Sequence, residues 1–171
     1  MRAALIAIGI AALATAAAAM TLTSRDVKDG ARMPALHVYP RCGGRNLSPQ
    51  LSWSGAPAAT KSFAISMIDH NVPPNDWTHW LIVDLPPTAT SLAQGAPPPP
   101  PARALRTDFG AAAYGGPCPP AGTGVHHYEI TVWAMPTPKT NLAHGTARQT
   151  QAALSHAALA HASLTVTAST P

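Results

Sequence analysis

The sequence lacks the motifs that define several common enzyme and nucleic-acid-binding classes. Its 171 residues include only two cysteines and no CxxC pair, which excludes a thioredoxin-like motif and a four-cysteine zinc site. There is no HExxH, HxH or GxSxG, and no Walker-type loop. Lys and Arg number 11 against 7 Asp and Glu and do not cluster, so nothing supports nucleic-acid binding.

The first residues predict export. Arg2 gives a short positive start, residues 3–19 are almost continuously apolar, and the alanines at 17–19 fit a cleavage site. This pattern is typical of a secretory signal peptide, here residues 1–19. An uncleaved anchor helix is the alternative, although the run is short for a bilayer. We therefore expect a single periplasmic or secreted domain over 20–171, with no transmembrane segment after cleavage.

The remaining chain reads as mostly β structure. Short apolar stretches separated by Gly- and Pro-rich turns are typical of antiparallel sheets. Thr146, as cap, and Gln149 form a capping-box pattern ahead of an Ala-rich, helix-favouring segment at 152–162, which predicts one late α-helix that starts after Thr146. Residues 91–107 are expected to form a loop. Strands or extended segments are expected at 36–39, 51–53, 63–69, 78–84, 125–135 and 164–167.

A carboxylate ends one predicted strand on its apolar face. Phe63, Ile65 and Met67 alternate like a buried strand face, and Asp69 falls on that face because strand side chains repeat every second residue. A carboxylate in such a place needs a partner. The sequence therefore predicts a polar contact at the end of this strand.

Two other predicted strands carry the candidate partners. His79 falls on the face of Leu81 and Val83, and His126 and Tyr128 share one face of the later strand. We predict that these three side chains and the preceding carboxylate meet in one polar pocket at the edge of a sheet.

The two cysteines, Cys42 and Cys118, lie far apart in the sequence. In an exported protein they can form one disulfide, for which the chain-entropy model allows about 4–5 kcal/mol as an upper estimate. Two free thiols are the alternative, because sequence does not show whether the two Cα atoms come close enough.

Six motifs in order make the chain resemble the phosphatidylethanolamine-binding protein (PEBP) family, also called Raf kinase inhibitor-like proteins, and in particular its bacterial exported branch. The motifs are CGGRNLSPQLSW at 42–53, KSFAISMIDHNVP at 61–73, WTHW at 77–80, DFG at 108–110, YGGPCPP at 114–120 and HHYEITVWAM at 126–135.

The resemblance implies a PEBP-like antiparallel β-sandwich with a small pocket that binds phosphate and phospholipid head groups. Asp69 matches the first Asp of the family's DPDxP signature, His79 its WxHW histidine, and His126 and Tyr128 its HxY pair. The resemblance also implies that a Gly-rich loop around Pro117 forms one wall of the pocket. The complete predicted ligand-binding set is Asp69, Trp77, His79, Tyr114, Gly115, Gly116, Pro117, His126 and Tyr128.

The chain departs from the family signature at two positions. His70 stands where the family has its first proline, and Asn71 replaces the second aspartate. The segment near the pocket therefore carries one negative charge fewer than the family pattern. This change either favours anions or reshapes the loop.

Two histidines, a tyrosine and the backbone N–H groups of a Gly-rich loop can together hold an anion. Asp69 would accept a hydrogen bond from His79 or His126, or meet a ligand amine. Alternatively, Asp69 and His79 form a buried pair that only locks the sheet. His126 and His127 point to opposite faces and cannot both bind one metal ion. Zinc held by Asp69, His79 and His126 is geometrically possible, but we expect no metal.

We expect a non-enzymatic, exported binding protein for a small anionic or phosphate-bearing ligand, without a cofactor. The possible nucleophiles, Cys118 and Ser48, are weak candidates. The alternative is an inhibitor that contacts a protein partner, a protease or a kinase, through the loops at 71–76 and 97–101.

Overall fold

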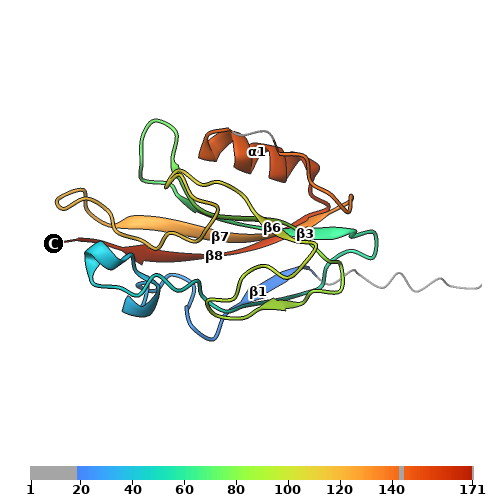
Figure 1. Ribbon diagram of the computed structural model, residues 1–171, viewed down its shortest axis with the longest axis horizontal. Coiled ribbons are helices and arrows are strands. Elements are labelled where there is room, and N and C mark those ends of the chain that lie inside the picture. Colours follow the sequence, from blue (N-terminus) through green and yellow to red (C-terminus); the bar gives the residue numbers. More distant parts are fainter. Residues whose placement is uncertain (1–18, 143–144, 171) are drawn as a thin grey trace, which may run out of the picture.

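The structure, a computed structural model, describes residues 19–142 and 145–170. Figure 1 shows three layers: a small sheet, a large sheet, and the helix α1 (Ala147–Ala157) over the outer face of the large sheet. The expected antiparallel sandwich with one late helix is therefore confirmed. The predicted signal peptide lies outside the described residues except for Ala19. Within the described ranges, no helix is both long enough and apolar enough to cross a bilayer.

All strand pairs in the two sheets are antiparallel. The small sheet has the order β1-β2-β5, and the large sheet has the order β6-β4-β3-β7-β8. The strand bounds are β1 Thr21–Thr23, β2 Leu51–Ser54, β3 Ser62–Asp69, β4 Trp77–Leu85, β5 Ser91–Leu92, β6 Arg103–Ala104, β7 His126–Met135 and β8 Ala160–Ala168.

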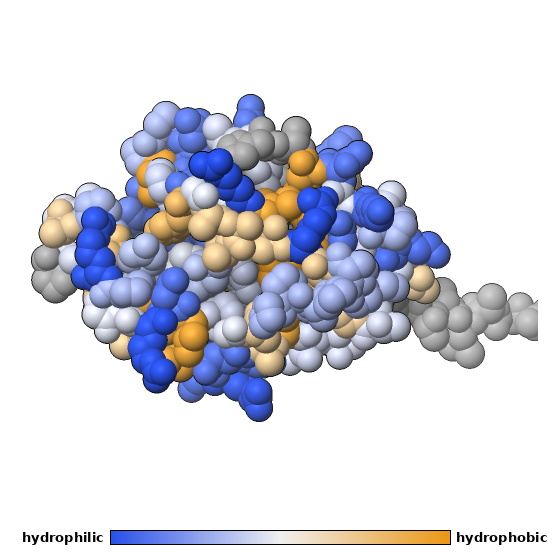
Figure 2. Space-filling model, in the orientation of Figure 1, coloured by the Kyte–Doolittle hydropathy of each residue, from blue (hydrophilic) through white to orange (hydrophobic). Residues whose placement is uncertain are grey.

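Two apolar clusters hold the layers together. The larger one fills the space between the sheets and includes Leu51 and Trp53 from β2 and Ile65 and Met67 from β3. The smaller one joins the opposite face of the large sheet to Leu154 of α1. The central strands β3 and β4 are almost wholly buried because both of their faces are covered. On the face in Figure 2, polar residues surround small, separate apolar patches.

The helix begins where the capping box predicts and ends earlier than expected. Thr146 caps it with the expected capping box, so the first turn starts at Ala147. It ends at Ala157, because β8 starts at Ala160 and pairs along almost all of β7. The prediction of a helix to residue 162 was wrong because continuous pairing with β7 outweighs the helix propensity of alanine.

The segment 36–39 is not a strand. It overlaps one short 3₁₀ turn, η1 (Ala35–His37), and is followed by a second, η2 (Pro40–Cys42). Bonds from Val38 N to Ala35 O and from Gly43 N to Pro40 O close the two turns. Pro40 favours the first position of such a turn because it has no N–H to leave unpaired. The expected loop at 91–107 likewise contains the two short strands β5 and β6.

Candidate functional site

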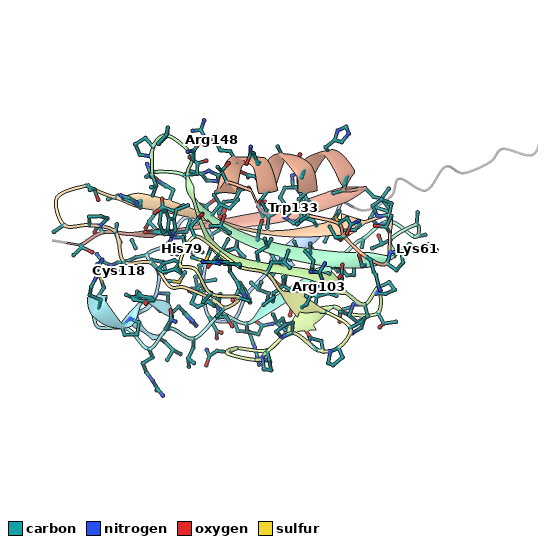
Figure 3. All side chains as sticks on the ribbon, turned by 45° about the horizontal axis from the view of Figure 1, so that its top comes forward. Lys61, His79, Arg103, Cys118, Trp133 and Arg148 are labelled. Atoms are coloured by element: carbon teal, nitrogen blue, oxygen red, sulfur yellow. A yellow bond between two sulfur atoms is a disulfide. The ribbon has the colours of Figure 1, made fainter. Side chains whose placement is uncertain are left out.

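A pocket of about 300 Å³ opens at one end of the sandwich, where β3 ends and β4 and β7 begin. In Figure 3, His79 and Cys118 lie towards this end, and Lys61 lies at the opposite end. Five of the nine predicted ligand-binding residues line the pocket, and six further residues complete its wall. The full lining is Arg41, Asp69, Val72, Trp77, His79, Phe109, Cys118, Pro119, Pro120, His126 and Tyr128.

Asp69, the last residue of β3, lies between the two neighbouring strands. Its register partners are Trp77 on β4 and Tyr128 on β7. Its carboxylate is buried, and both oxygens are hydrogen-bonded: Oδ2 lies 2.7 Å from Nδ1 of His126, and Oδ1 accepts from the backbone N of Asn71 at 2.9 Å. Asp69 therefore joins the floor of the pocket to the loop that follows β3.

His126 is the residue that pairs with Asp69. Its ring is buried, and its second nitrogen, Nε2, lies 2.9 Å from Oγ1 of Thr123. Thr123 Oγ1 donates to the carbonyl of Pro120 at 2.7 Å. Since both ring nitrogens have protein partners, His126 positions the pocket wall and has no free nitrogen for a ligand.

His79 lies on the other face of β4 from the one predicted. Met67 pairs with Trp80 and Ile68 pairs with Thr78, so a β-bulge leaves His79 without a partner in the ladder. The extra residue turns the His79 ring towards Tyr128, with ring centroids 5.0 Å apart. The prediction that His79 shares a face with Leu81 and Val83 was wrong, but the bulge still brings His79 into the pocket.

Burial fixes the protonation of His79. It lowers the pKa of His79 to about 4, so the ring is neutral at neutral pH. Nδ1 lies 2.7 Å from the carbonyl oxygen of Gly115, which can only accept, so Nδ1 carries the ring proton. Nε2 is then an acceptor. The alternative of a hydrogen-bonded Asp69–His79 pair is not realised, because each residue has another partner.

Tyr128 has a buried hydroxyl group without a hydrogen-bond partner among the described residues. Burial and the Asp69 carboxylate raise the pKa of Tyr128 above its ordinary value, so the hydroxyl keeps its proton. The carboxylate lies close to the hydroxyl, but the contact falls short of hydrogen-bond geometry. Buried hydroxyl groups are normally hydrogen-bonded, because an unpaired one costs about 1–3 kcal/mol. An unpaired donor at the wall of a pocket is a group that a ligand can satisfy.

The Gly-rich loop supports the pocket from behind and does not line it. Gly115 N donates to His79 O at 2.8 Å, and Gly116 N donates to Oδ1 of Asn46 at 2.7 Å. The prediction that these N–H groups hold an anion was wrong, because both are used within the protein. Tyr114 donates its hydroxyl proton to His37 O, and Pro117 O accepts from Tyr39 N.

The two glycines permit close packing. A Cβ on Gly115 would lie 2.6 Å from the Phe109 ring, and one on Gly116 would overlap the carbonyl of His37. The smallest residue is therefore needed for Phe109 to reach the pocket and for 114–117 to pack on η1. Phe109 also stacks on Tyr39, with centroids 5.4 Å apart.

The residues that the sequence prediction missed come mainly from loops. Arg41 is exposed and lies next to Cys42, which is bonded to Cys118 with a Cα–Cα distance of 5.6 Å. The expected disulfide is thus present, and it fastens η2 to the Pro119–Pro120 wall. Phe109 lies in the DFG segment already noted, which was the only available signal for its position.

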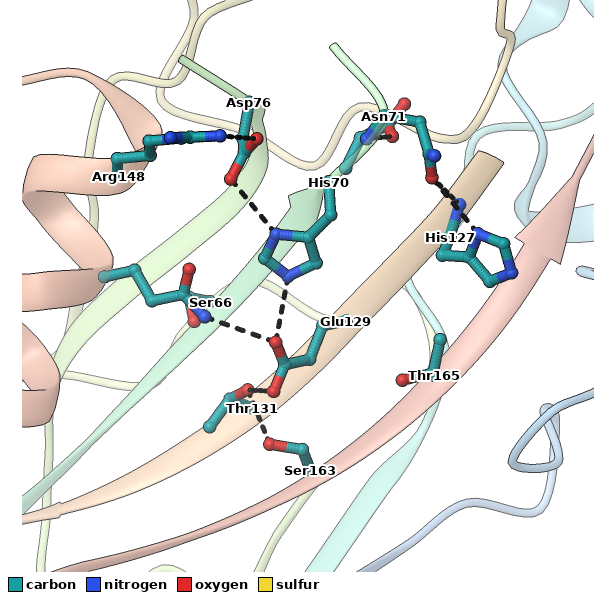
Figure 4. A network of polar contacts seen from close by, with 12 residues as sticks. Ser66, His70, Asn71, Asp76, His127, Glu129, Thr131, Arg148, Ser163 and Thr165 are labelled. Atoms are coloured by element: carbon teal, nitrogen blue, oxygen red, sulfur yellow. Dashed lines mark hydrogen bonds and ion pairs between the residues drawn. The ribbon is translucent and has the colours of Figure 1, made fainter. Parts of the chain in front are cut away.

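A polar network holds the 70–76 loop beside the pocket (Figure 4). His70 lies between two carboxylates, with Nδ1 3.1 Å from Asp76 Oδ2 and Nε2 2.9 Å from Glu129 Oε2. Asp76 also accepts from Arg148 of α1, and Glu129 accepts from Gln151. An ionised carboxylate cannot donate, so both contacts of His70 are hydrogen bonds only when the imidazole is protonated.

The two departures from the family signature therefore act on the loop. Asn71 Oδ1 accepts from the backbone N of His127 at 2.8 Å, and neither His70 nor Asn71 lines the pocket. His127 is exposed, as the alternation of the strand predicted. Both side chains therefore make contacts that hold the loop, and neither presents a group to the pocket.

The His70 network predicts a window of pH in which it stabilises the fold. Hydrogen bonding to Glu129 raises the pKa of His70. The stability that the protonated His70 adds to the fold is therefore complete below about pH 6.5 and is lost as the pH rises through the raised pKa. The same bond lowers the pKa of Glu129 to about 2. The stability that the ionised Glu129 adds is therefore present above pH 4.5, the ordinary pKa, and is lost on acidification towards pH 2. His70→Gln should lower the free energy of unfolding by about 1 kcal/mol at pH 5.5 and by less at pH 8.5.

Urea denaturation at pH 3, 5.5 and 8.5 measures this window. His156→Gln, on the exposed side of α1, is the control and should change the free energy of unfolding by under about 0.5 kcal/mol. An equal loss for His70→Gln at pH 5.5 and 8.5 would contradict the role of the imidazolium.

Comparison with known proteins tests the family that the order of the motifs suggests. The family model for phosphatidylethanolamine-binding protein matches residues 23–169. The chain belongs to the phosphatidylethanolamine-binding protein family. The UPF0098 protein YbcL of Escherichia coli K12 is 42% identical over 132 residues, which is 72% of each chain. The UPF0098 protein of Aquifex aeolicus is 35% identical over 135 residues, 77% of each chain.

Solved structures agree with this assignment to the PEBP family. The crystal structure of E. coli YbcL, a new member of the mammalian PEBP family, superposes with a TM-score of 0.82 at 35% identity and covers 90% of this chain and 100% of that one. A putative PEBP homologue from Chlamydia trachomatis, CT736, gives a TM-score of 0.74 at 30% identity, with coverages of 90% and 99%. The PEBP fold expected from the motifs is therefore shown.

Proposed function

We propose that this chain is a non-enzymatic binding protein whose pocket takes a small phosphate-bearing or otherwise anionic ligand resembling a phospholipid head group. The observation that carries the proposal is the buried hydroxyl of Tyr128 at the pocket wall, for which the described part of the chain offers no hydrogen-bond partner. The Tyr128 hydroxyl would donate a hydrogen bond to a phosphate oxygen. Such a charge-assisted hydrogen bond is stronger than a neutral one. The ligand named in the family description, phosphatidylethanolamine, has such a phosphate.

Three polar groups of the pocket remain available to a ligand. Tyr128 and the exposed Arg41 are donors, and Nε2 of His79 is an acceptor. A ligand that meets all three must offer both acceptor oxygens and a proton to donate. A monoprotonated phosphate group satisfies this requirement, and so does a phosphate that carries an ammonium group.

The positions of the possible nucleophiles favour binding over covalent catalysis. Cys118 is part of the disulfide, so it has no thiol to react. Ser48 is buried and does not line the pocket. The same disulfide supports the proposed periplasmic or secreted location, because disulfides persist in oxidising compartments.

A pair of Tyr→Phe variants tests the proposal by calorimetric titration with phosphoethanolamine. Tyr128→Phe should weaken binding roughly 10- to 100-fold, which corresponds to about 1.5–3 kcal/mol for a hydrogen bond to a charged group. Its free energy of unfolding should be unchanged or slightly higher, because the lost hydroxyl has no partner among the described residues.

Tyr114→Phe is the matched control, since its hydroxyl bonds to His37 O outside the pocket. It should lower stability by about 1 kcal/mol and leave the affinity unchanged. Equal affinities for all three proteins, or no heat with the wild-type protein at millimolar ligand, would overturn the proposed function.

The acceptor role of His79 predicts a preference among simple anions. Phosphate near pH 6.5 carries a proton that can be donated to Nε2 of His79, and sulfate carries none. We expect phosphate to bind about tenfold more tightly than sulfate, as one hydrogen bond of about 1.4 kcal/mol would give. Competition with phosphoethanolamine in the calorimeter measures both affinities.

Arg41→Gln should weaken the binding of phosphate and of sulfate by a similar factor, because Arg41 supplies charge without requiring a proton from the ligand. Sulfate binding as tightly as phosphate would show that His79 does not accept a hydrogen bond from the ligand.

A further inference from the structure

A second groove, with two arginines in its lining, lies beside the pocket. It has a volume of about 270 Å³ and is formed by side chains from the segments 32–42, 117–119 and 168–170. We call it the basic groove, because Arg32 and Arg41 line it and no carboxylate of the described residues does. Its lining is therefore cationic, whereas the pocket also contains a carboxylate.

Three contacts fasten the walls of the basic groove to one another. Met33 N donates to Thr167 O at 2.8 Å, which joins the first segment to the end of β8. Tyr39 N donates to Pro117 O at 3.1 Å, and the disulfide described above joins the same two segments. The walls are thus held in place before anything binds, and a ligand does not have to order them.

Most of the hydrogen-bonding capacity of the two arginines remains available. Arg32 is exposed and donates one hydrogen bond, from Nη2 to Ser169 O at 3.2 Å. Arg41 is also exposed, and none of the hydrogen bonds or ion pairs of the described residues involves its side chain. A guanidinium group carries five N–H donors in a planar fork that matches the two oxygens of a carboxylate. Both arginines can therefore receive carboxylates.

The net positive charge of residues 20–171 lies in the segment that forms the first wall. Residues 25–45 contain five Lys and Arg side chains and two carboxylates, a net charge of +3, and residues 46–171 contain five of each. In Figure 1 this blue-to-cyan segment lies near the end of the chain marked C. Its two carboxylates already accept from the protein, Asp26 from Gln50 N and Asp29 from Thr165 N. An acidic partner is therefore attracted to this side of the molecule.

Apolar side chains supply much of the remaining lining of the basic groove. Met33, Val38 and Ala168 contribute to it, together with the neighbouring hydroxyl residues Ser169 and Thr170. A single phosphate or sulfate ion would meet the arginines and leave this apolar surface in contact with water. A peptide would cover it with side chains and place carboxylates at the arginines at the same time.

We infer that the basic groove binds an acidic peptide segment of a protein partner. Carboxylates of this segment would form bidentate pairs with Arg32 and Arg41, and its apolar side chains would pack on Met33. Single-stranded nucleic acid fits the groove poorly, because none of the lining side chains is aromatic and could stack on a base. The inference goes beyond the proposed function and does not depend on it, since the groove and the pocket share only three lining residues.

Two variants change the basic groove without changing the pocket. Arg32→Gln removes a charge from the groove, and Arg106→Gln is its matched control, because Arg106 is equally exposed and lines a separate cavity. Ala35→Trp adds a ring at an exposed position of the groove and leaves the charge unchanged. Neither Arg32 nor Ala35 lines the pocket, so all three variants should bind phosphoethanolamine like the wild-type protein.

The experiment titrates the purified protein into two fluorescein-labelled hexapeptides and follows their fluorescence anisotropy. One peptide alternates glutamate with leucine, and the other has glutamine in place of glutamate. We expect the acidic peptide to bind about tenfold more tightly than the neutral one or better, as charge-assisted hydrogen bonds would give. Its affinity should fall between about 20 and about 200 mM NaCl, because salt screens exposed charges. Arg32→Gln and Ala35→Trp should each weaken it about fivefold or more, and Arg106→Gln less than about twofold.

Equal losses in Arg32→Gln and Arg106→Gln would overturn the inference, because the attraction would then follow net charge alone. Loss of peptide binding in Tyr128→Phe would overturn it as well, since the peptide would then occupy the pocket. Tighter binding of dextran sulfate with the same dependence on Arg32 would replace the peptide by an anionic polysaccharide. Calorimetry with phosphoethanolamine keeps the two proposals apart. Peptide binding without phosphoethanolamine binding would overturn only the proposed function, and the reverse result would overturn only this inference.

Discussion

The double variant Cys42→Ser/Cys118→Ser should unfold with a free energy about 4–5 kcal/mol below that of the oxidised protein, as an upper estimate. The bridge joins residues 76 positions apart, so its loss restores much freedom to the unfolded chain. For a domain of this size the change corresponds to a fall in Tm of roughly 10–18 °C. Thermal and urea denaturation of both proteins, with and without reductant, measure it.

Reductant supplies the control, because it should destabilise the wild-type protein and leave the double variant unchanged. A difference of less than about 1 kcal/mol between the two oxidised proteins would contradict a stabilising bridge. Free thiols that react with an alkylating reagent in the oxidised wild-type protein would contradict the bridge itself.

Asp69→Ala should lower the free energy of unfolding by about 2–5 kcal/mol, because each donor that is left without its acceptor costs about 1–3 kcal/mol. It leaves Nδ1 of His126 and the backbone N of Asn71 without their acceptor. The loop after β3 should also loosen, so amide hydrogen exchange at 70–76 should become faster.

Asp29→Ala is the matched control, since Asp29 is exposed and accepts one bond, from Thr165 N. It should lower stability by about 0.5–1.5 kcal/mol. The double variant Asp69→Ala/His126→Phe should recover part of the loss, because no imidazole is then left unpaired. A loss for Asp69→Ala as small as that for Asp29→Ala would show that the buried pair contributes little.

The sequence predicts the parts of the site that depend on strand alternation. Asp69, His126 and Tyr128 lie on the apolar faces of β3 and β7, and the uninterrupted register between these strands preserves that alternation. His79 is different because a bulge in β4 adds one unpaired residue, so the strict alternation of side chains between the two faces is broken there. A bulge leaves no clear mark in a single sequence, since it depends on how two strands pair.

Residues that reach the pocket from loops could not be placed in this way. Arg41 and Phe109 come from segments without a repeating pattern, and their positions depend on the disulfide and on ring stacking. The Gly-rich loop was misinterpreted for a related reason. Free N–H groups suggest an anion site, but Asn46 and His79 already accept from them, and these acceptors lie 70 and 36 positions away in sequence, respectively.

The most direct test of the proposed pocket is a map of backbone amide NMR shifts during titration with phosphoethanolamine. We predict saturable shifts at residues whose segments surround the pocket: Asp69, His79, Phe109, His126 and Tyr128. The neighbouring basic groove of about 270 Å³ shares Arg41, Cys118 and Pro119 with the pocket but also includes Arg32 and residues 168–170, so shifts at these unshared residues distinguish the two. Shifts confined to that groove, or no shifts at millimolar phosphoethanolamine, would contradict a ligand site at Tyr128.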